Sequence, residues 1–229
     1  MITVQSNNSD ISTKRDNFNV KRSEETEIKN ILKITTASSL SALGIVLSSI
    51  TVLIPNVEFI SFTIFLITIL FGFSTGLFSM ISISLIYELI VTPIYGSSGI
   101  LILFKMACYL ILILTTMILR KIIDHLAFWE IGLFGGLFAL FYDIATTVGG
   151  QLLILQENIT LAYLFTVIVF GIPFTVVHIL GNFIIFSSLK EIINWIKIAF
   201  NYKGIDYISL GFFENKKVTS LKNRTKKEE

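Results

Sequence analysis

Residues 71–105 read FGFSTGLFSMISISLIYELIVTPIYGSSGILILFK, and this stretch decides how the chain folds. Two long apolar runs flank a short polar segment from Thr92 to Gly99, a pattern that predicts two membrane-spanning helices joined by a turn. Glu88 precedes this segment by about one helical turn, and Lys105 follows it by about one and a half turns. Charges inside apolar helices are costly, so each one marks a candidate site. We expect the rest of the chain to hold these two groups at the same end of a helical bundle.

The composition of the whole chain is that of a membrane protein. Of its 229 residues, 53% are hydrophobic and 15% are charged, whereas soluble domains carry about 25% charged residues. The mean hydropathy is +0.78. A single cysteine, Cys108, excludes an intrachain disulfide and a cysteine-based metal site. We therefore predict an all-α polytopic membrane protein, a bundle of six transmembrane helices with both termini cytoplasmic. The predicted spans are about 34–54, 59–73, 75–91, 100–119, 129–148 and 161–186.

The basic residues predict the orientation of these spans. Lysines and arginines gather before the first span, between the fourth and the fifth at Arg120 and Lys121, and after the sixth. The loops after spans one, three and five contain neither residue. Placing both termini in the cytoplasm puts every basic cluster on the inner side of the cell membrane, as the positive-inside rule requires.

The chain divides into three parts in this interpretation. Residues 1–33 form a polar cytoplasmic tail, which we predict to be disordered through Asn30. Residues 34–188 form the transmembrane domain. In 189–229, the amphipathic segment Lys190–Asn201 predicts a helix lying on the inner leaflet, followed by a basic cytoplasmic tail attracted to anionic lipid.

Small residues recur at helical spacing and predict where helices approach closely. In span one, they follow one face at Ala37, Ser41, Gly44 and Ser48, with a second pair at Ser38 and Ala42. This surface fits either packing within the chain or docking of another membrane protein. Gly72 and Gly76 favour a tight turn between spans two and three. The stripe in span five, which we expect to face protein, is Gly132, Gly136, Ala139, Asp143, Thr146 and Gly150.

The predicted topology brings three ionisable groups to one depth. Glu88, Lys105 and Asp143 each fall in the outer third of a different span. One hypothesis is a structural ion-pair cluster, in which Lys105 pairs with Glu88 or Asp143. The other is a polar pocket that opens outward and binds a solute. His178 lies on a face of span six with Gly171, Thr175 and Asn182; we interpret it as a hydrogen-bonded packing residue in the inner half, away from the other ionisable groups.

Signatures of catalysis are missing from the sequence. It has no HExxH, no paired catalytic carboxylates, no membrane serine with a partnered histidine and no phosphate-binding glycine loop. We therefore expect no enzymatic activity, catalytic residue, metal, cofactor or nucleic-acid partner. A membrane enzyme of unrecognised type is kept as a minor alternative.

The membrane part, about Ile34 to Ser188, resembles the substrate-binding (S) component of an energy-coupling factor (ECF) vitamin transporter. The likeness rests on the six spans, the small-residue first helix and three segments. These segments are IPNVEFISF at 54–62, FGFSTG at 71–76 and YGSSGILILFKMACY at 95–109. The sequence differs from the family pattern at 100–103, where aliphatic residues replace aromatic residues and proline, and at Lys105, where a neutral amide is expected.

This resemblance implies that the protein captures a vitamin or related micronutrient at the outer face. It also implies docking through the first helix onto a transmembrane coupling protein that carries two ATPase subunits. The docking residues would be Ala37, Ser38, Ser41 and Ala42. The residues near the substrate would be Glu88, Tyr95, Ser97, Lys105 and Asp143. The alternative is a structural scaffold similar to the small six-span cell-shape proteins, which needs no outward pocket.

Overall fold

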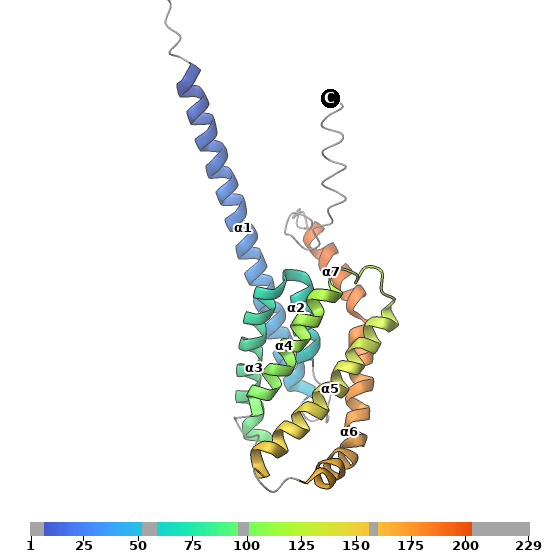
Figure 1. Cartoon of the computed structure of the whole chain (residues 1–229). Helices are drawn as coiled ribbons and strands as arrows, with labels where there is room; N and C mark the ends of the chain where they lie inside the picture. Colours follow the sequence, from blue (N-terminus) through green and yellow to red (C-terminus); the bar gives the residue numbers. More distant parts are fainter. Residues whose placement is uncertain (1–6, 52–58, 96–100, 156–159, 203–229) are drawn as a thin grey trace, which may run out of the picture. The chain divides into compact units, whose positions relative to one another are not determined.

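The computed structural model describes residues 7–51, 59–95, 101–155 and 160–202, and within these ranges the chain is helical without strands (Figure 1). The helices are α1 (Asn7–Ile50), α2 (Ile60–Phe71), α3 (Phe73–Tyr95), α4 (Leu101–Leu119), α5 (Phe128–Leu155), α6 (Leu161–Ser187) and α7 (Leu189–Tyr202). Five stretches in α1 and α3–α7 are long and apolar enough to cross a membrane. The all-α prediction is confirmed, and a polytopic membrane bundle follows from these five helices. Their orientation in the membrane stays a prediction.

The polar N-terminal segment differs from the prediction. Helix α1 begins at Asn7 and continues without a break to Ile50, so residues 7–30 are helical where we expected disorder. This segment is rich in lysine, arginine and glutamate, which have high helix propensity. The chain separates into two compact units, Met1–Thr36 and Ala37–Glu229, and the packing described below belongs to the second.

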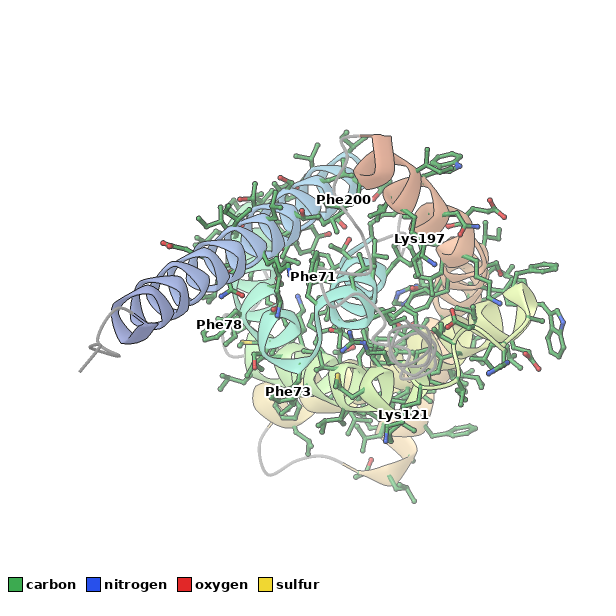
Figure 2. The ribbon with its side chains drawn as sticks, turned by 90° about the horizontal axis from the view of Figure 1, so that it is seen from above. Phe71, Phe73, Phe78, Lys121, Lys197 and Phe200 are labelled. Atoms are coloured by element: carbon green, nitrogen blue, oxygen red, sulfur yellow. The ribbon has the colours of Figure 1, made fainter. Side chains whose placement is uncertain are left out.

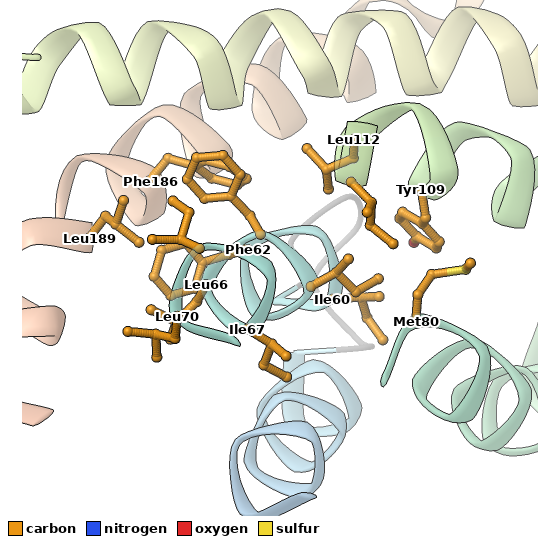
Figure 3. Packing of buried hydrophobic residues seen from close by; sticks show 14 of the residues in the cluster. Ile60, Phe62, Leu66, Ile67, Leu70, Met80, Tyr109, Leu112, Phe186 and Leu189 are labelled. Atoms are coloured by element: carbon orange, nitrogen blue, oxygen red, sulfur yellow. The ribbon is translucent and has the colours of Figure 1, made fainter. Parts of the chain in front are cut away.

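Helix α2 is the centre of the second unit. All 12 of its residues are buried, because the sequence ISFTIFLITILF is largely apolar on every face and such a helix is stable only where protein or lipid excludes water. Figure 3 shows its side chains between two layers: Phe186 and Leu189 lie on one side, and Met80, Tyr109 and Leu112 on the other. At about 18 Å, α2 is shorter than the hydrocarbon core of about 30 Å. The second of the six predicted spans is therefore too short to cross the membrane by itself.

A glycine hinge joins α2 to α3. Gly72 has a φ of 87°, a conformation that only glycine adopts easily, and its N–H donates to the Thr68 carbonyl over 2.9 Å. Four residues later, Gly76 lies against Thr68, whose Cα would be 3.3 Å from an added Cβ. The two helices thus fold back on each other, and the predicted tight turn is confirmed. Arg120 closes this end of the bundle by donating from Nη2 to the Leu70 carbonyl over 3.5 Å.

The stripe of small residues on α5 faces protein, as predicted, and its first part packs against α6. An added Cβ at Gly132 would lie 2.7 Å from the Phe183 carbonyl oxygen, and one at Gly136 would lie 3.2 Å from Ile179. As the residue number rises along α5, the number of its partner on α6 falls, so the two helices are antiparallel. This close approach of two backbones fixes which polar residues of α5 and α6 can meet.

The small-residue face of α1 is divided between the interior and the surface. Ala37 and Ser41 are buried, and a Cβ added at Gly44 would lie 2.8 Å from the Thr63 Cβ of α2. Ser38 and Ala42 are exposed. Of the four predicted docking residues, two therefore pack within this chain, and a docking surface would rest on Ser38 and Ala42.

Helix α7 presents two apolar strips. Ile193 is buried, and Ile192, Ile196 and Phe200 pack against the core. Trp195 and Ile198 are 70% and 65% exposed. The start of the helix is fixed by Lys190, whose Nζ donates to the Asp124 carbonyl over 3.2 Å. Its place on the inner leaflet stays a prediction.

Candidate functional site

An ion pair joins α3 to α4 near their connection. Lys105 Nζ lies 2.7 Å from Glu88 Oε2, with 20% of the lysine side chain and 8% of the glutamate side chain exposed. Of the two carboxylates proposed as partners for Lys105, the structure thus places Glu88 beside it. The pairing follows from the hairpin, because the two residues lie at similar distances before and after the connecting segment. Ser97 and the side chain of Tyr95 lie outside the described residues.

The third predicted site residue, Asp143, belongs to a separate pair. Its Oδ1 lies 2.7 Å from Nδ1 of His178 on α6. Because an ionised carboxylate only accepts hydrogen bonds, we infer that Nδ1 carries the proton and donates it. The expectation that His178 lies away from the other ionisable groups is therefore wrong. The cause is the length of α5, which continues to Leu155 instead of ending near Val148, so that Asp143 lies near the middle of its helix.

Two tyrosines lie between these pairs. The Tyr109 hydroxyl on α4 donates to the Tyr142 hydroxyl on α5 over 3.2 Å, and the two rings stack with centroids 5.3 Å apart. The Tyr142 ring also meets the His178 ring edge-on, with centroids 6.0 Å apart. Tyr109 follows Lys105 by one turn, and Tyr142 directly precedes Asp143. Polar side chains from α3, α4, α5 and α6 therefore form a row across the bundle.

The α5–α6 end of this row contains acceptor atoms without a hydrogen-bond donor among the described residues. They are Asp143 Oδ2 and Asn182 Oδ1, both buried. Asn182 is oriented by its own amide, which donates from Nδ2 to the His178 carbonyl over 3.2 Å. Buried polar atoms in native proteins are nearly always hydrogen-bonded. Two buried acceptors of this kind suit the N–H or O–H groups of a polar solute, or ordered water.

The cluster is not arranged as a metal centre. Within the described ranges, no three His, Cys, Asp or Glu residues lie close enough to hold a metal ion. Asp143 and His178 supply two ligand atoms, whereas protein metal sites commonly use three or four protein ligands. The arrangement is suited to hydrogen bonding and charge pairing.

The sequence pattern does not identify all of this row: it assigns His178 to packing and does not single out Tyr109 or Tyr142. One signal is present, because the Asp143 stripe of α5 and the His178 face of α6 both carry small residues, which favour close approach of helices. Pairing these two stripes would have brought Asp143 and His178 together.

The chain was also compared with known proteins. Comparisons with protein-family models, with curated proteins and with solved structures found no match.

Proposed function

We propose that this protein is the substrate-binding subunit of an ECF-type transporter, a membrane protein that captures a small polar solute such as a vitamin. The observation that carries the proposal is the pair of buried acceptors, Asp143 Oδ2 and Asn182 Oδ1, on facing helices. Such atoms destabilise a membrane bundle when no ligand is bound, because each unsatisfied polar group in an apolar setting costs free energy. A bound solute with two donor groups would satisfy both.

The remaining parts of the row have roles in this proposal. Tyr142 and His178 supply ring surfaces and orient the acceptors, while the Glu88–Lys105 pair bounds the site on the α3–α4 side. In the predicted topology, α3–α4 connect at the outer face, so the solute enters there. Transport is driven by a coupling protein and two ATPase subunits, with Ser38 and Ala42 of α1 forming the exposed small-residue contact.

A structural scaffold is the second candidate, and the polar side-chain pairs favour it. Lys105 with Glu88 and His178 with Asp143 each join two neighbouring helices at 2.7 Å. A protein whose task is to hold a bundle rigid would use polar side chains in this way and would bind no solute.

Thermal melting of the purified protein with a panel of water-soluble vitamins separates the two candidates. A ligand stabilises the folded state by an amount that rises with the ratio of its concentration to its Kd. We expect one vitamin to raise the melting temperature of the wild type. Asp143→Asn changes Oδ2 from an acceptor to a donor while retaining an acceptor for His178, so the shift should be lost. The matched control Asp124→Asn, at an exposed position, should keep it. A panel without any stabilising vitamin would favour the scaffold.

A further inference from the structure

A cavity of the bundle is apolar, and its lining shares no residue with the polar row. It has a volume of about 300 Å³ and is bounded by α1, α2, α6 and α7. Its lining residues are Leu40, Leu43, Gly44, Leu47, Phe59, Phe62, Thr63, Leu66, Ile184, Ile185, Ser188 and Ile192. We call this cavity the α1–α6 groove.

The chemistry of the groove excludes polar occupants. Among the described residues that line the groove, Thr63 and Ser188 are the only ones with polar side-chain atoms. The Thr63 hydroxyl donates to the Phe59 carbonyl over 2.8 Å, and the Ser188 hydroxyl donates to the Ile185 carbonyl over 2.6 Å. Both hydroxyl protons are thus used within their own segments. A buried water needs two to four polar partners, so the groove favours hydrocarbon over water.

The rim of the groove narrows the choice of hydrocarbon occupant. Leu43 and Ile184 at the rim are 53% and 68% exposed. The groove therefore opens on the outer surface of the bundle, which in a membrane is the acyl region. An acyl chain of the surrounding lipid can enter an apolar groove that opens there.

A positive charge lies toward the α7 end of the groove. Ile192 in the first turn of α7 lines the groove, and Lys197 follows it by about one and a half turns. Figure 2 shows Lys197 on the side of α7 that faces α2, near Phe200, while Trp195 on the same helix is 70% exposed. An ammonium at this position complements the phosphate of a lipid headgroup.

We propose that the α1–α6 groove binds one acyl chain of an anionic phospholipid from the surrounding bilayer, with the headgroup phosphate near Lys197. The site is independent of solute binding at the polar row. Because one lysine near an anionic lipid contributes a factor of about five in binding, the groove should enrich phosphatidylglycerol over phosphatidylcholine by about that factor.

Site-specific photocrosslinking tests this proposal. The full chain carries p-benzoylphenylalanine in place of Leu47, which lines the groove, or in place of Val46, which is 53% exposed and outside the lining. Each variant is reconstituted in nanodiscs that contain equal amounts of phosphatidylglycerol and phosphatidylcholine. After irradiation, the crosslinked adducts are identified by mass spectrometry. We expect about five-fold enrichment of phosphatidylglycerol at position 47, a ratio near one at position 46, and loss of the enrichment in Lys197→Gln. The same ratio of phosphatidylglycerol to phosphatidylcholine adducts at both positions would overturn the proposal. So would an adduct at position 47 with a protein segment, whether residues 204–213 of the same chain, a second copy of the chain or another protein.

Native mass spectrometry supplies a second measurement that needs no photoreactive residue. Leu47→Trp fills the groove, and Val46→Trp adds the same side chain outside it. The wild type and Val46→Trp should retain one phosphatidylglycerol molecule that Leu47→Trp loses. Equal retention by the two tryptophan variants would contradict binding in the groove.

Discussion

Removing the charge of Lys105 should destabilise the protein even when no solute is present. Glu88 is buried beside it, with 8% of its side chain exposed, so Lys105→Met leaves a carboxylate without its counter-ion in an apolar bundle. Breaking a buried pair in this way costs roughly 3–5 kcal/mol. Because the Lys105 side chain is 20% exposed, we expect the lower end, about 3 kcal/mol, which reduces the folding equilibrium constant roughly a hundred-fold.

The assay is unfolding in mixed micelles with a rising fraction of sodium dodecyl sulfate, followed by circular dichroism. The double variant Glu88→Gln/Lys105→Met carries neither charge and should recover most of the lost stability, because the cost lies in the uncompensated carboxylate. Lys121→Met, at an exposed position, is the control for loss of a lysine. Wild-type stability of Lys105→Met, or a double variant as unstable as the sum of both single variants, would refute a buried pair and would indicate two solvated charges.

Four further predictions concern the scaffold and its orientation. Gly132→Ala should lower the melting temperature, because the added Cβ would lie 2.7 Å from the Phe183 carbonyl oxygen. Gly171→Ala should leave it unchanged, because no atom lies within 4 Å of the added Cβ; equal melting temperatures of the two variants would contradict the close α5–α6 contact. Gly72→Ala should destabilise the protein by about 1–3 kcal/mol, because its backbone at φ 87° and ψ −176° lies in a region essentially restricted to glycine; an unchanged free energy of unfolding would argue against the hinge. Ser41→Leu, at a buried position, should impair folding, while Ala42→Leu should fold and lose co-purification with a coupling protein; intact co-purification would remove Ala42 from the docking surface. In a Cys108→Ala background, cysteines at Ser97 and Glu157 should react with an impermeant reagent outside intact cells, and one at Ser220 only after the cells are opened; the reverse pattern would invert the topology.

The features that depend on local sequence could be predicted. The hinge at Gly72 follows from two glycines one turn apart between apolar runs. A hairpin with charges at similar distances from its turn places Glu88 and Lys105 at one depth, while the choice of Glu88 over Asp143 as the partner of Lys105 needed the structure. The stripe from Gly132 to Gly150 identifies the face of α5 that contacts protein, because only small residues allow two backbones to approach. In each case the relevant partner is either adjacent in the sequence or marked by residue size.

The features that depend on where apolar helices end could not be predicted. No charge or proline follows Val148 directly to mark an end, and α5 continues through Gly149 and Gly150 to Leu155. The added residues move Asp143 from the predicted outer third to the helix middle, where it meets His178. Helix α2 posed a different problem, because an all-apolar segment looks the same whether lipid or protein surrounds it.

The central claim is that the buried acceptors on α5 and α6 hold a small polar solute. Native mass spectrometry of the protein purified in mild detergent tests it most directly, after incubation with a mixture of water-soluble vitamins. The wild type and Asp124→Asn should each carry one added small molecule that is distinct in mass from phospholipid, and Asp143→Asn should carry none. A wild type that shows only the mass of the chain and its lipids, or an Asp143→Asn variant that retains the same small molecule, would contradict the account.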